Sequence, residues 1–121
     1  MTRKKVGRNY HAPLRTFKKG ATRNTDRGKV DYEGHLSPLV IQWYGEFCDK
    51  QRHLPDGTLR ASDNWQLGIP VDSYMKSAWR HFLLWWLGHR GHRTREETLA
   101  ALGGLLFNVQ GYLHEVLKEE R

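Results

Sequence analysis

The sequence has few of the features that crosslink a chain or anchor it in a membrane. It contains a single cysteine, Cys48, which excludes an internal disulfide and argues against a zinc site built from thiolates. A reducing compartment fits this composition best, and we expect the protein in the cytoplasm. No run of about 18 apolar residues occurs, and the charged N-terminus lacks the apolar block of a signal peptide. We therefore expect no membrane partner.

Motifs of two common enzyme classes are also missing. The glycines that follow Lys18 do not have the spacing of a Walker A loop, so a P-loop is not predicted. No serine lies in a GxSxG context, so a nucleophilic triad of that type is not predicted either. His89 and His92 lie in a basic turn after an expected helix. There they complement the negative end of the helix dipole more readily than they bind a metal.

Acidic residues are scarce in the first thirty residues, which hold one aspartate and ten lysines and arginines, a net charge of +9. The other ninety-one residues hold ten lysines and arginines and twelve acids, a net charge of −2. A basic segment of this kind attracts an anionic partner, such as nucleic acid, nucleotide phosphates or an acidic protein. The alternative is a solvated tail that only aids solubility.

Three apolar patterns with helical spacing predict three main helices. The first covers residues 37–52, because Ser37 is a good N-cap and Pro38 a good first helical residue. The second covers residues 72–88, and apolar side chains around most of its circumference predict the most buried helix of the fold. The third covers residues 94–118 and begins with a capping box formed by a threonine and the glutamate three residues later.

We therefore predict an all-α fold, a small bundle of three main helices with a long basic N-terminal arm. Residues 1–16 have no periodicity and are predicted as a flexible basic arm, and residues 17–121 as a single helical domain. A structured loop is expected between the first two helices, because Trp65 is too large and apolar to leave in water. Gly68 and Pro70 shape its backbone, and loops held in this way often carry binding groups.

The third predicted helix has two faces of different composition. One is an apolar packing seam with spacings of three and four, made of Leu99, Leu102, Leu106, Val109, Leu113 and Val116. The other contains Gly104, Asn108 and Gly111, although a glycine inside a helix costs about 1 kcal/mol relative to alanine. Either a second helix packed close to the backbone or a ligand beside Asn108 would explain these glycines. The apolar seams also predict a homo-oligomer.

Two pairs of neighbouring residues are candidates for chemistry. Arg80 and His81 lie in the middle of the aromatic second helix, where a charged arginine is costly unless it is paired. Arg80 would either pair with an acid of the bundle or grip a phosphate, with His81 as a hydrogen-bond donor or general acid–base. Asp31 and Glu33 offer two carboxylates, which are the kind of oxygen ligand that Mg²⁺ prefers.

The order of these motifs resembles that of the phage family of dATP/dGTP diphosphohydrolases (N-terminal domain). The resemblance covers roughly residues 17–118. The chain is also similar in type to the wider MazG-like all-α nucleotide pyrophosphohydrolases. The motifs that carry it are Gly20-Ala21-Thr22-Arg23, Gly28-Lys29, Asp31-Tyr32-Glu33-Gly34, Leu36-Ser37-Pro38, Ser62-Asp63-Asn64-Trp65-Gln66-Leu67-Gly68-Ile69-Pro70, Tyr74, Ser77, Arg80-His81 and Phe107-Asn108.

The resemblance implies an Mg²⁺-dependent hydrolase, in the cytoplasm of a phage-infected bacterium, that converts dATP or dGTP to the monophosphate and pyrophosphate. In this interpretation Trp65 stacks on the purine, Asn64 or Asn108 reads its edge, and lysines neutralise the phosphates. The residues assigned to it are Arg80 and His81 for catalysis, Lys18, Lys19, Lys29, Asn64, Trp65 and Asn108 for substrate binding, and Asp31 and Glu33 for the metal.

The acidic residues depart from the MazG-like pattern, which places an ExxE pair on one helix and an ExxD pair on the next. This chain has only Glu46 and Asp49 at such a spacing on its first helix, and no acid between Asp72 and Gly88. Glu97 is available from the start of the third helix. Two alternatives therefore stay open beside hydrolysis. The chain is a non-catalytic nucleotide binder, or it is a nucleic-acid or virion-associated protein that acts through residues 1–30.

Overall fold

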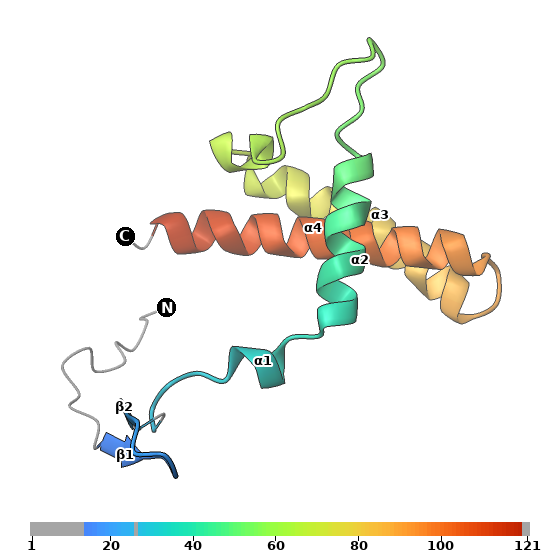
Figure 1. Cartoon of the computed structure of the whole chain (residues 1–121). Helices are drawn as coiled ribbons and strands as arrows, with labels where there is room; N and C mark the ends of the chain where they lie inside the picture. Colours follow the sequence, from blue (N-terminus) through green and yellow to red (C-terminus); the bar gives the residue numbers. More distant parts are fainter. Residues whose placement is uncertain (1–13, 26, 120–121) are drawn as a thin grey trace. The chain divides into compact units, whose positions relative to one another are not determined.

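The computed structural model describes residues 14–25 and 27–119, which form a mostly helical structure with one small sheet (Figure 1). The contacts within the chain divide it into two units, one that ends at Leu36 and one that begins at Ser37. The prediction of a flexible arm over residues 1–16 lies outside the described residues, except for its last three. Those three residues form a strand.

The first unit contains an antiparallel hairpin that the sequence patterns did not predict. Strand β1 (Leu14–Thr16) pairs with strand β2 (Thr22–Asn24), and the register places Arg15 opposite Arg23. Two backbone hydrogen bonds of 2.9 Å close the turn between the strands, and Gly20 adopts a φ of 88°, which favours glycine. Because of this hairpin, the chain is mostly helical rather than all-α.

A short helix follows in the same unit and involves both of the predicted metal ligands. Helix α1 (Tyr32–His35) includes Glu33, and Asp31 is its N-cap. The Asp31 carboxylate accepts a hydrogen bond of 3.0 Å from the backbone N–H of Gly34. A short aspartate side chain just before a helix is well placed to satisfy such a donor, which is why this segment turns into a helix.

The second unit confirms the three predicted helices, α2 (Pro38–Lys50), α3 (Val71–His89) and α4 (Arg95–Glu119). The Ser37 hydroxyl accepts from the backbone N–H of Val40 at 3.3 Å, as expected of an N-cap. Thr94 and Glu97 form the predicted capping box, with reciprocal bonds of 2.9 and 3.1 Å. In the part of the chain that the structure describes, no helix is both long and apolar enough to cross a membrane.

Helices α3 and α4 lie side by side, and α2 crosses the pair (Figure 1). The contact uses the glycine face of α4, and a Cβ added to Gly104 would overlap the imidazole of His81. A Cβ on Gly111 would overlap the ring of Tyr74 in the same way. Of the two explanations for these glycines, close packing of another helix is therefore confirmed.

This contact overturns one expectation about burial and shows which face of α4 packs on α3. Helix α4, and not α3, holds most of the buried residues, since Tyr74 is the buried residue of α3 whereas α4 has Ala101, Gly103, Gly104, Asn108 and Gly111. The leucine seam of α4 does not face α3, and much of it is exposed. The physical reason is that glycines let the two backbones approach closely, so the small residues take the contact and the leucines are left on other sides of the helix.

Candidate functional site

A pocket of about 350 Å³ opens in the second unit, between α2, the loop that follows it, α3 and α4. Its volume lies in the range of small-molecule sites. Its aromatic lining comes from Tyr44, Phe47, Trp65 and Phe107. Its polar lining includes amides, hydroxyls, one imidazole and two guanidinium groups, but no carboxylate of a described residue. The pocket is therefore suited to an anionic ligand with an aromatic or apolar part.

Trp65 forms one wall of this pocket and fixes the loop to α4. It lies in the short 3₁₀ helix η1 (Asn64–Leu67), which precedes α3. Its ring meets Phe107 edge-on at 6.4 Å between centroids and His114 at 4.8 Å. Such contacts are favourable beyond the area they bury. The prediction of a structured loop held by its tryptophan is confirmed, and the same loop brings Asn64 to the pocket.

Asn108 brings a buried amide to the pocket from α4. Its side chain is 5% exposed, and its amide nitrogen donates to the carbonyl of Gly104 at 2.7 Å and to the Ser77 hydroxyl at 3.1 Å. Both amide hydrogens are thus used, and Oδ1 accepts no hydrogen bond from a described residue. Oδ1 is not one of the fully buried side-chain atoms that lack a partner among the described residues, so it reaches the open space of the pocket and is available to a ligand there.

His81 lies against the backbone of α4 at Gly104 and lines the same pocket. Its Nδ1 is buried and has no hydrogen-bond partner among the described residues. Burial, and then the neighbouring Arg80 charge, lower the pKa of His81, which favours the neutral imidazole near pH 7. Burial raises the pKa of the Tyr44 hydroxyl, which lies beside the Cys48 thiol. Both groups are therefore neutral polar groups within the pocket.

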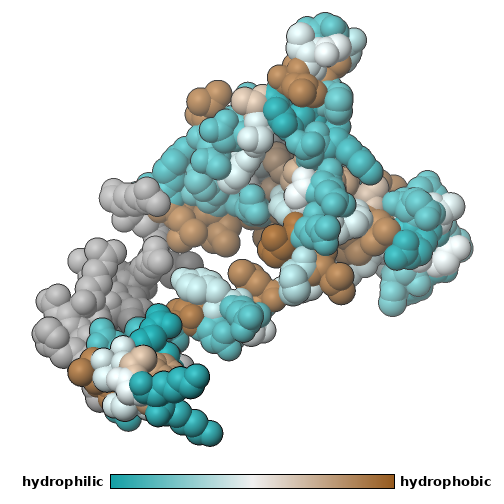
Figure 2. Space-filling view, viewed as in Figure 1, coloured by the Kyte–Doolittle hydropathy of each residue, from teal (hydrophilic) through white to brown (hydrophobic). Residues whose placement is uncertain are grey.

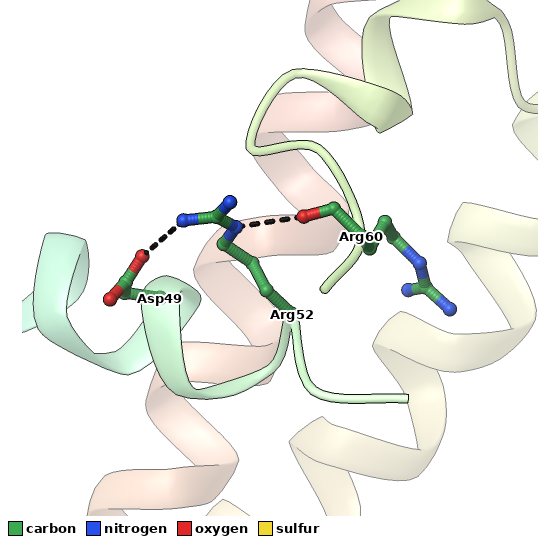
Figure 3. A network of polar contacts seen from close by, with 3 residues as sticks. All are labelled: Asp49, Arg52 and Arg60. Carbon is green, nitrogen blue, oxygen red and sulfur yellow. Dashed lines mark hydrogen bonds and ion pairs between the residues drawn. The ribbon is translucent and has the colours of Figure 1, made fainter. Parts of the chain in front are cut away.

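Two arginines of the pocket come from either side of the turn after α2 (Figure 3). The Arg60 backbone N–H donates to the Arg52 carbonyl at 2.7 Å, and Arg52 Nε donates to the Arg60 carbonyl at 2.8 Å. Arg52 also pairs with Asp49 at 2.9 Å. The Arg60 side chain points away from Arg52, and its guanidinium has no ion pair among the described residues. Arg60 is therefore available to an anionic ligand.

Our sequence interpretation did not include these arginines in the site. The signal that points to them is the turn Pro55-Asp56-Gly57, in which Gly57 has a φ of 86° and Asp56 accepts from Thr58. A tight turn of this kind brings the residues that flank it together, and this one pairs the chain on either side of it.

The predicted site residues fall into three groups. Four of them, Asn64, Trp65, His81 and Asn108, line the pocket described above. Arg80 is exposed on α3, lies outside the lining, and has no ion pair among the described residues. The remaining five belong to the first unit and are exposed, namely Lys18, Lys19, Lys29, Asp31 and Glu33.

The pocket itself does not fit a metal ion held by the protein. No carboxylate of a described residue lines it, and residues 14–25 and 27–119 contain no cluster of three or more His, Cys, Asp or Glu side chains. The Asp31 carboxylate accepts a hydrogen bond from the Gly34 N–H, which leaves it fewer lone pairs for a cation.

Comparison with known proteins gives no matching family model, no matching curated protein and no matching solved structure. Function is therefore inferred from the chemistry of the pocket.

Proposed function

We propose that the pocket of the second unit binds a purine deoxynucleoside triphosphate. The observation that carries this proposal is the composition of one lining: an aromatic wall, an Asn108 amide oxygen that accepts no hydrogen bond from a described residue, and Arg60, which has no ion pair among the described residues. Each part of a nucleotide has a counterpart in that set. The base needs an aromatic surface, its polar edge needs a directional partner, and the phosphates need cations.

The ligand is expected to lie with its base against Trp65 and Phe107. Asn108 Oδ1 accepts from an N–H of the purine edge, a hydrogen bond that no described residue supplies. Arg60 meets the phosphates, since a guanidinium offers paired donors to phosphate oxygens. Asn64 lines the same pocket and is proposed as a second group that reads the base.

The test is calorimetric titration of the full chain with dGTP, dATP, dCTP and dTTP. We expect the two purine nucleotides to bind more tightly, because their rings cover more of the aromatic wall. Arg60→Ala is expected to weaken binding about tenfold, which corresponds to about 1.4 kcal/mol. Arg93→Ala, an exposed arginine outside the lining, serves as the matched control. Equal affinities for all four nucleotides, or no binding, would rule the proposal out.

Hydrolysis of that nucleotide to the monophosphate and pyrophosphate is a second candidate, favoured by His81 and by the family resemblance. His81 lines the pocket, and its lowered pKa suits a neutral base near pH 7. Arg80 remains the second proposed catalytic residue. Asp31 and Glu33 remain the proposed Mg²⁺ ligands, and Lys18, Lys19 and Lys29 remain the proposed phosphate-binding residues. Bound Mg²⁺ would supply charge neutralisation at the phosphates.

Turnover distinguishes an enzyme from a binder. The chain is incubated with dGTP or dATP, with Mg²⁺ and with EDTA, and the products are separated by ion-exchange chromatography. An enzyme releases monophosphate and pyrophosphate only with Mg²⁺, and His81→Gln is expected to slow it by about a hundredfold or more. Tight binding with no product under either condition would leave a non-catalytic binder and remove the hydrolase proposal.

Binding of nucleic acid is favoured by a separate observation in the first unit. The hairpin pairs Arg15 with Arg23 across its strands, and its turn adds Lys18 and Lys19. These cations form a basic surface, and a polyanion bound there would release counterions, which favours its binding. Because this hairpin belongs to the first unit, its function is tested independently of the pocket.

A further inference from the structure

Helices α3 and α4 leave a broad apolar surface exposed, which we call the outer face. It consists of four residues of α3 and four of α4: Met75, Trp79, Phe82, Trp86, Leu106, Val109, Leu113 and Leu117. Each of these side chains is between 41% and 66% exposed. In Figure 2, hydrophobic residues (brown) lie among hydrophilic ones (teal) on the surface of the helical unit.

The two halves of the outer face are joined by a groove between the helices. This groove is lined only by apolar side chains, four from α3 and Leu105 from α4. Leu105 lies one turn before Val109, and residues four apart share one side of a helix. The apolar surface therefore continues from the aromatic residues of α3 across Leu105 to the leucine seam of α4.

Helix α4 has the composition of a helix that is covered on both sides. Residues 98–113 contain no charged side chain. A helix without a charged face is normally buried all round. In this structure one side of α4 packs against α3 and α2, whereas Leu106, Val109 and Leu113 of the seam are between 42% and 54% exposed.

The size of the outer face is that of a protein interface. From the exposed fractions, we estimate an apolar area on the order of 800 Å², which is about what each partner buries in a stable complex. The largest apolar patch on a typical monomer is about 300–600 Å². The outer face is therefore too large to be an ordinary surface feature.

We propose that the outer face is the interface with a second copy of this chain, with the two α4 helices antiparallel about a two-fold axis. The seam from Leu99 to Val116 repeats at three and four residues, which is the spacing of a helix that packs along a like helix. A two-fold axis lets one self-complementary surface serve both copies.

Charge at the two ends of α4 favours the antiparallel orientation. Residues 90–97 carry three arginines and two glutamates, a net charge of +1, whereas residues 115–119 carry Glu115, Lys118 and Glu119, a net charge of −1. An antiparallel pair places the net positive end of each copy near the net negative end of the other, and a parallel pair places ends of like net charge together. The α3 aromatic residues of each copy then cover the edge of the partner's α4.

The test is the mass of the full chain in solution, measured by sedimentation equilibrium between about 1 and about 100 μM, where interfaces of this size associate. We expect twice the chain mass of 14.2 kDa at the upper end of that range. Val109→Glu and Leu113→Glu are each expected to shift the dimer dissociation constant upward by at least about a hundredfold, since each buries a charge in the interface. Far-UV circular dichroism checks that each variant keeps its helices.

A matched control separates this interface from general stickiness. Leu39→Glu also replaces a leucine by glutamate, at a residue of α2 that is 78% exposed and lies outside the outer face. The mass of this variant in solution should therefore equal that of the wild type at each concentration. If the wild type has the mass of one chain at every concentration, the occupant is a segment of the first unit or a different protein, and the proposal is wrong. It is equally wrong if folded Val109→Glu and Leu113→Glu remain dimeric.

Discussion

His81 shows how a single residue connects packing to chemistry in this protein. Its ring lies on the backbone of α4 because Gly104 has no side chain in that position. The same contact buries Nδ1 without a partner among the described residues and lowers the pKa of the imidazole. A group that helps to hold α3 against α4 is therefore also a polar group of the pocket, and any substitution of it affects both.

The lowered pKa predicts how stability depends on pH. The unfolded chain takes up a proton at His81 near pH 6.5, whereas the folded chain does so only at lower pH. The free energy of unfolding should therefore fall as the pH drops below the pKa of the unfolded group. Urea denaturation at about pH 7.5 and about pH 5.5 should show a smaller loss for His81→Gln than for the wild type. His53→Gln, at an exposed histidine, should match the wild type.

At the scale of the element, α4 illustrates that a small residue can decide a helix contact against larger ones. Its leucine seam is the more apolar face, yet α3 packs against the face with Gly104 and Gly111. Close approach of the backbones there brings many atoms into contact, whereas leucines would hold the helices farther apart. The leucine seam is then left for other contacts.

Glycine-to-alanine substitutions measure how closely α3 and α4 approach each other. Gly104→Ala adds a methyl group where the His81 ring lies, and we expect a loss of about 1–3 kcal/mol in the free energy of unfolding. Gly45→Ala is the matched control, because a Cβ there meets nothing within 4 Å. It should stabilise α2 by about 0.5–1 kcal/mol through helix propensity alone. If Gly104→Ala were stabilising too, the close approach of α3 and α4 would be incorrect.

At the scale of the whole molecule, charge and apolar surface are segregated along the chain. The first thirty residues carry a net charge of +9 and the other ninety-one carry −2. The second unit carries the pocket and the outer face, and the first unit carries the basic hairpin. The affinities of the two units for their anionic partners are therefore expected to depend differently on salt concentration.

This segregation predicts where the salt dependence of nucleic-acid binding comes from. Replacing the four basic hairpin residues, Arg15, Lys18, Lys19 and Arg23, by glutamine should lower the slope of log affinity against log salt by about 0.9 for each phosphate that the hairpin neutralises. The matched control replaces the same number of cations in the second unit: Lys50, Lys76, Arg93 and Lys118. Equal effects of the two sets in a salt titration would mean that total charge, and not the hairpin, attracts the nucleic acid.

The sequence by itself determined the features that depend on residues close together in the chain. The helix starts at Ser37 and Thr94 follow from hydrogen bonds that span three residues, so local residue types were enough to predict them. The hairpin in the first unit was missed, because short strands with several cations carry little periodic signal.

Only the tertiary structure decided which surfaces meet. The face of α4 that packs depends on how closely another helix can approach it, and the spacing of apolar residues in the sequence does not predict that distance. The pocket likewise combines groups from Tyr44 to Gln110, including the Arg52–Arg60 pair that a turn brings together. Asn64, Trp65, His81 and Asn108 were predicted as site residues from their chemistry together with the family resemblance, but their convergence on one cavity depends on contacts between residues far apart in the chain.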